Sequence, residues 1–109
     1  MQTPNNAPTL VATPAPDGKP GWLMLTLNLP GGQCSSAGPV DPINYWPAAA
    51  SLGFWASRHL PRLETLAVNV DALNIKSDFF AQNLARQLGR ALAEGFEQAQ
   101  DPSHPLNNL

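Results

Sequence analysis

The sequence predicts an α+β domain in which a small sheet of about three strands packs with two helices. Leucines alternate with other residues between positions 22 and 29, which is the period of a half-buried strand. Apolar residues recur every three to four positions between residues 78 and 98, which is the period of an amphipathic helix. Nine of the twelve prolines lie in residues 1–47. Because proline interrupts regular structure, we expect turns and strand edges there and the longest helix later.

The first two strands are predicted as a hairpin. Residues 22–29 place Leu23, Leu25, Leu27 and Leu29 on one face, while residues 9–13 form a shorter apolar segment upstream. Residues 14–21 between them are dense in proline and glycine, as in a turn. Prolines flank residues 9–13, so we expect this short strand at the edge of the sheet.

A helix is predicted over residues 47–59 and a third strand over residues 63–70. Pro47 suits a first helical turn, three alanines follow it, and Pro61 ends the helix. Leu66, Val68 and Val70 then share one face of the strand. The segment from Trp22 to Val70 is compatible with a parallel βαβ crossover or with a looser α+β arrangement.

The longest helix is predicted over residues 78–98. Ser77 is a favourable N-cap, and Asp78 suits the positive end of the helix dipole. Its apolar row consists of Phe80, Leu84, Leu88, Leu92 and Phe96. A parallel row of small residues consists of Ala81, Ala85, Gly89 and Ala93, and the earlier helix has a matching row of Ala49, Gly53 and Ser57.

Two glycines inside the predicted helices need an explanation. A mid-helix glycine costs about 1 kcal/mol relative to alanine. We therefore expect something to pack against Gly53 and Gly89. Close packing within the chain and a helix pair formed between subunits both satisfy this expectation.

One domain accounts for the length and composition of the chain. With 109 residues, we place the domain at residues 9–101 and predict flexible tails rich in proline and asparagine at residues 1–8 and 102–109. Hydrophobic residues make up 43% of the chain and charged residues only 13%, against about 25% charged in typical globular proteins. Such a weakly charged surface is typical of a domain that contacts other protein.

Several aromatic residues are candidates for that contact. Residues 30–46 are predicted as a long loop without regular structure, and Tyr45 and Trp46 at its end either cover the first helix or form a contact surface. Phe79 projects to the polar face of the long helix, where either a loop covers it or it forms an exposed aromatic anchor. A sheet this small leaves its second face partly uncovered, which predicts a homodimer or another protein partner. The predicted interaction residues are Trp22, Tyr45, Trp46, Phe79, Arg86, Gly89 and Arg90.

The leading hypothesis is therefore a non-catalytic protein-interaction module, such as an adaptor, inhibitor or assembly subunit. One alternative is a small enzyme or ligand-binding domain that uses the 30–46 loop, with Cys34 as nucleophile and His59 as base. A further alternative is binding of an anionic ligand or nucleic acid through Arg58, Arg62, Arg86 and Arg90, although the net charge of −2 argues against a dedicated nucleic-acid binder.

The remaining expectations concern cofactors and location. We expect no cofactor and no metal, because Cys34, His59 and His104 are too few and too scattered for a zinc site. No apolar segment is long enough to span a membrane, and no secretory signal is apparent. A lone cysteine forms no internal disulfide, so we expect a cytoplasmic location.

Overall fold

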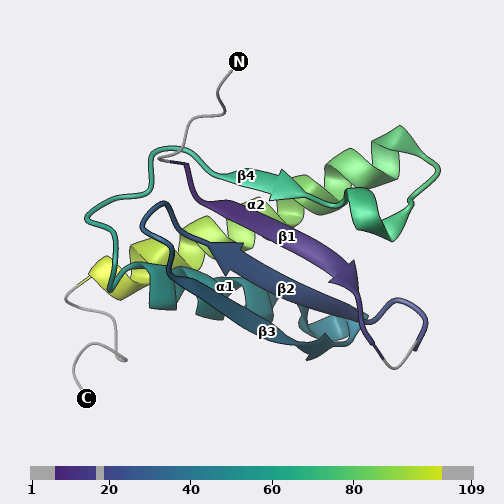
Figure 1. Cartoon of the computed structure of the whole chain (residues 1–109), viewed down its shortest axis with the longest axis horizontal. Coiled ribbons are helices and arrows are strands. Elements are labelled where there is room, and N and C mark those ends of the chain that lie inside the picture. Colours follow the sequence, from purple (N-terminus) through teal and green to yellow (C-terminus); the bar gives the residue numbers. More distant parts are fainter. Residues whose placement is uncertain (1–6, 17–18, 102–109) are drawn as a thin grey trace.

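The computed structural model describes residues 7–16 and 19–101 of the chain. Over these residues the chain forms a four-stranded mixed sheet packed with two helices, which confirms the α+β class (Figure 1). The elements in order are β1 (Thr9–Pro14), β2 (Leu23–Asn28), β3 (Cys34–Val40), the 3₁₀ helix η1 (Pro42–Asn44), α1 (Tyr45–Ala56), β4 (Ala67–Asn69), the 3₁₀ helix η2 (Asp71–Leu73) and α2 (Asp78–Gln100). Of the tails predicted at residues 1–8 and 102–109, residues 1–6 and 102–109 lie outside the described residues.

The strands are ordered β3-β2-β1-β4 across the sheet. β1 and β2 form the expected antiparallel hairpin, and β3 is antiparallel to β2. β4 pairs in parallel with β1, so the expectation that β1 is an edge strand is wrong. The flanking prolines explain the difference: Pro8 precedes the strand and Pro14 is its last residue, so the residues between them can donate hydrogen bonds to both neighbours.

β3 and η1 lie in residues 30–46, where the sequence predicts no regular structure. β3 contains serines, a glycine and a proline, which have low strand propensity, and it is held by long-range pairing with β2. Because β3 and β4 both run in the direction of β1, the parallel crossover passes from β3 through α1 to β4. The crossover therefore does not start from β2.

Both helices cover one face of the sheet (Figure 1). The leucines of β2 point into this layer, where they pack with Leu52 of α1 and with Leu88 and Leu92 of α2. The opposite face has no covering layer in the described part of the chain. It carries small or uncharged side chains, among them Thr26, whose Oγ1 lies 2.9 Å from Oγ of Ser36.

The boundaries of the other elements differ modestly from those predicted. α1 begins at Tyr45, so that Pro47 lies within its first turn. α2 begins after Ser77, whose Oγ accepts a hydrogen bond from the backbone N–H of Phe80 at 3.3 Å, as the N-cap prediction requires. The strand predicted at residues 63–70 is only three residues long, because only Ala67–Asn69 pair with β1. Leu63 and Leu66 precede this pairing and line a hollow beside α2.

The two helices touch backbone to backbone at a pair of glycines. A Cβ atom placed on Gly53 of α1 would lie 2.0 Å from the carbonyl oxygen of Leu92, and one placed on Gly95 of α2 would lie 2.0 Å from that of Ala50. Packing within the chain therefore accounts for Gly53. The partner on α2 is Gly95, which the sequence did not single out, and the predicted small row containing Gly89 faces β4 instead.

Candidate interaction surfaces

The first candidate surface, which we call the aromatic end, lies at the end of the molecule that holds the start of α2, η1 and the connection between β1 and β2 (Figure 1). We define it by its apolar residues, which are Trp22, Ile43, Tyr45, Trp46, Leu73, Ile75, Phe79, Phe80 and Leu84. Four of them are large side chains open to solvent, with exposed fractions of 87% for Ile43, 72% for Phe79, 63% for Phe80 and 39% for Trp46.

Phe79 is exposed, which is one of the two expected alternatives, whereas the exposure of Phe80 contradicts the prediction. Its place in the apolar row of α2 predicts burial beside Leu84 and Leu88. The first turns of α2 extend past the end of the sheet, and no layer of the described chain covers them (Figure 1). The two phenylalanine rings pack edge to face on each other, with centroids 5.7 Å apart. Together they form an aromatic protrusion at the start of the helix.

Two hollows lie at the same end of the molecule, and Leu84, one turn after Phe80, lines both of them. The larger, of about 400 Å³, is lined mainly by Trp22, Tyr45, Leu73, Ile75 and Leu84. The smaller, of about 140 Å³, lies between η1 and α2, and Tyr45 and Leu84 line it too. Among the described residues, the one charged side chain lining either hollow is Lys19, whose Nζ lies 4.5 Å from the centroid of the Trp22 ring. The aromatic end thus combines exposed apolar side chains with two hollows whose described lining is mainly apolar.

Tyr45 and Trp46 take different roles here. The hydroxyl of Tyr45 donates a hydrogen bond to the carbonyl of Gly21, which ties the start of α1 to the turn before β2. Nε1 of Trp46 donates to Oε1 of Glu94 at 3.2 Å. Tyr45 is half-buried and joins two segments of the fold, whereas the Trp46 ring stays partly open to solvent.

The environment of Tyr45 predicts how it titrates. Burial raises the pKa of its hydroxyl, and the nearby Asp41 carboxylate raises that pKa further. The folded state therefore holds this proton more tightly than the unfolded chain does, so the free energy of unfolding should fall as the pH rises from about 10. Tyr45 is the only tyrosine of the chain, so tyrosinate absorbance reports on it alone.

We expect Tyr45 to ionise at higher pH in the folded protein than in the urea-unfolded chain. Tyr45→Phe should remove the additional fall in the free energy of unfolding at high pH. Asp41→Asn should lower the raised pKa of Tyr45 part of the way towards its value in the unfolded chain. Equal titration of the folded and unfolded chain would contradict this expectation.

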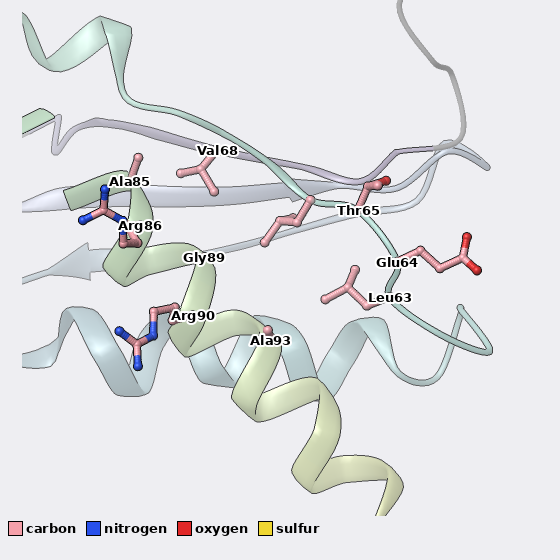
Figure 2. A pocket seen from close by; sticks show the side chains of 10 residues that line it. Leu63, Glu64, Thr65, Val68, Ala85, Arg86, Gly89, Arg90 and Ala93 are labelled. Carbon is pink, nitrogen blue, oxygen red and sulfur yellow. The ribbon is translucent and has the colours of Figure 1, made fainter. Parts of the chain in front are cut away.

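The second candidate surface, which we call the β4–α2 groove, runs between the edge strand and the long helix (Figure 2). It has a volume of about 340 Å³. Leu63, Leu66 and Val68 form one wall, and the small residues Ala85, Gly89 and Ala93 of α2 form the floor. Glu64 also lines it, but Figure 2 shows its carboxylate directed away from α2.

Two of the predicted arginines lie at this groove. Arg86 and Arg90 are exposed, one turn apart on α2, at the rim beside the glycine floor (Figure 2). Within residues 7–16 and 19–101, neither forms an ion pair, since the one salt bridge there joins Arg62 to Glu64 at 2.9 Å. Arg58 is exposed just after α1. Of the four arginines considered as an anion site, the structure therefore brings Arg86 and Arg90 together.

The alternative pair of Cys34 and His59 is separated by the sheet. Cys34 begins β3 and is exposed, and it lies on the same side as Ser36, the uncovered face. His59 follows α1 on the covered side, where its ring packs on Trp55 with centroids 4.8 Å apart. This arrangement does not provide a nucleophile and a base on one surface.

The described residues contain no group of three or more His, Cys, Asp or Glu side chains that could hold a metal ion. In the same part of the chain, no helix is both long and apolar enough to cross a membrane.

Comparisons of the chain with protein-family models, curated proteins and solved structures find no match.

Proposed function

We propose that this protein is a non-catalytic protein-interaction module that assembles through its aromatic end, with a second copy of the chain as the partner. The observation that carries the proposal is the exposure of Phe79 and Phe80 at the end of the molecule that also holds two apolar hollows. Fully burying one such side chain contributes roughly 1.5–3 kcal/mol. Burying the phenylalanine pairs of both copies would offset the cost of association.

The shape of the aromatic end supports a second copy as occupant. In a two-fold symmetric interface the same patch serves both subunits, so it must supply both the protrusion and the cavity that receives it. Here the phenylalanine pair projects from the start of α2, and the larger hollow lies beside Leu84, one turn after Phe80. Phe79 and Phe80 of one copy can fill the hollows of the other by a two-fold rotation.

The charge distribution supports the same occupant. Lys19 is the one charged side chain among the described residues that line the hollows, so an apolar protrusion can enter them without the loss of hydrated ion pairs there. A strongly charged partner would find no complement there. Aromatic anchors in apolar hollows are also the usual energetic centres of protein interfaces.

We expect sedimentation equilibrium of the full chain to give a mass that rises with concentration towards twice the 11.6 kDa of one chain. The double variant Phe79→Ser, Phe80→Ser should weaken association by roughly a thousandfold or more, since each aromatic anchor is worth about 2 kcal/mol and a two-fold interface loses both anchors from both copies. Because both rings are exposed, this variant should keep the wild-type circular dichroism.

Two controls accompany this measurement. Gln82→Ser changes an exposed polar residue of the same helix and should leave association unchanged. Cys34→Ser removes the exposed thiol and should also leave it unchanged, which excludes a disulfide-linked dimer. A wild-type protein that stays monomeric throughout, or a double variant that associates like the wild type, would refute the proposal.

A further inference from the structure

The β4–α2 groove lies apart from the aromatic end and has features that self-association does not use. From these features we propose that it binds an extended, mainly apolar peptide segment of another protein that carries at least one acidic side chain. The segment adds as a strand at the free edge of β4 and places alternate side chains over the floor of the groove. This proposal does not depend on dimerisation.

The first argument is the free edge of β4. The backbone N–H of Ala67 donates to the carbonyl of Pro8 at 3.0 Å, so the backbone groups of Ala67 face β1. Along a strand these directions alternate, so the N–H and C=O of Leu66 and Val68 face away from β1, at the edge. The other edge strand, β3, contains Pro39 and an irregular register, features that discourage pairing. β4 has neither feature, and its three residues offer a short edge for pairing.

The second argument is the glycine in the floor. A Cβ atom on Gly89 would lie 3.4 Å from Cγ2 of Val68 and 3.8 Å from Cδ2 of Leu66, which are ordinary contact distances. Packing within the chain therefore tolerates an alanine here, in contrast to Gly53 and Gly95. Glycine is nonetheless the residue present, despite its unfavourable helix propensity. Its effect is to keep the floor open beside the edge of the strand.

The third argument is the charge at the rim. Arg86 and Arg90 project from α2 next to the floor and are without a carboxylate partner among the described residues. A strand added at β4 lies beside Ala85 and Gly89. Figure 2 shows the guanidinium groups of Arg86 and Arg90 directed away from Leu63 and Thr65, so a carboxylate of the added strand must project across the floor to meet them. Apolar walls with an unpaired cationic rim favour an apolar segment that carries carboxylates, because arginine and carboxylate form charge-assisted hydrogen bonds.

The test begins with a phage-displayed library of random octapeptides. Peptides are selected from it on the wild-type full chain and, in parallel, on the full-chain Gly89→Leu variant. Leucine is a good helix former and should fill the groove without unfolding α2. We expect peptides enriched on the wild type to alternate aliphatic and polar residues and to contain Asp or Glu. No enrichment over Gly89→Leu, or enrichment without acidic residues, would overturn the proposal. Gly89→Ala is the matched control and should still select such peptides.

A synthetic copy of the enriched peptide then separates the two kinds of contact. Arg86→Gln with Arg90→Gln should lower its affinity roughly tenfold or more, and added salt should lower the wild-type affinity. N-methylation of alternate residues removes backbone donors. It should abolish binding for one alternate set and leave it nearly unchanged for the other. Equal tolerance of both sets, as for a peptide that docks as a helix, would overturn strand addition.

The Phe79→Ser, Phe80→Ser variant distinguishes this proposal from dimerisation. It should bind the peptide as the wild type does, whether or not the wild type dimerises. Loss of peptide binding in this variant would place the peptide at the aromatic end and overturn the assignment to the groove.

Discussion

Gly53→Ala is expected to lower the free energy of unfolding by at least about 3 kcal/mol, at the upper end of the usual cost of overpacking a core. The added methyl group would lie 2.0 Å from the carbonyl oxygen of Leu92 and 2.7 Å from the backbone nitrogen of Phe96. Both atoms belong to the backbone of α2, so no side-chain rotation relieves the clash and the helices must separate. Urea denaturation followed by circular dichroism measures this loss.

Two other glycines give matched controls. Gly95→Ala should be as damaging, because its methyl group meets the backbone of Ala50 at 2.0 Å. Gly89→Ala should instead stabilise the protein by up to about 1 kcal/mol, because its methyl group meets only ordinary contacts and alanine favours the helix. A Gly53→Ala variant as stable as the wild type would show that the helices do not cross at this point.

Leu92→Ala is expected to cost about 2–5 kcal/mol, the usual range for a fully buried leucine. Leu92 has no exposed surface and belongs to the cluster between the sheet and both helices. Its removal leaves a cavity whose rim is partly helix backbone at the Gly53 crossing, which limits how far the surroundings can close. The midpoint of urea denaturation should fall with an unchanged slope.

Phe80→Ala is the control from the same apolar row of α2. Phe80 is mostly exposed, so this change should alter stability by no more than about 0.5 kcal/mol, although it removes more atoms. Both variants should be measured at protein concentrations where the chain is monomeric, so that association does not contribute. A similar loss of stability in both would mean that Phe80 is covered within the monomer.

The elements with a clear local sequence pattern, β2 and α2, were predicted well. The alternating leucines of β2 and the Ser77 cap and apolar row of α2 gave nearly correct boundaries. β3 was missed because its residues have weak strand propensity and its pairing with β2 is a long-range interaction. The order of the strands was missed for a similar reason: the prolines around β1 suggested an edge, but they lie at its ends.

The candidate surfaces were only partly predictable. Phe79 was identified because it breaks the apolar row, whereas the exposure of Phe80 depends on where the sheet ends relative to α2, which no local pattern contains. Gly89 and the two arginines were singled out separately. That they share one groove with Val68 follows from the parallel pairing of β4 with β1. Helical spacing alone did not decide among the sheet, the other helix and a second subunit as the neighbour of Gly89.

The shortness of β4 has a consequence for the order in which this molecule folds. β1, β2 and β3 follow one another in the chain and pair across short connections, whereas β4 reaches β1 only after the whole of α1 has intervened. Loop-closure entropy makes such a contact late to form, and three residues of ladder hold it weakly. The wall of the groove is thus the last part of the sheet to assemble and the first to open. A peptide strand bound at β4 would hold this wall closed and slow the exchange of the β4 backbone amide hydrogens with solvent.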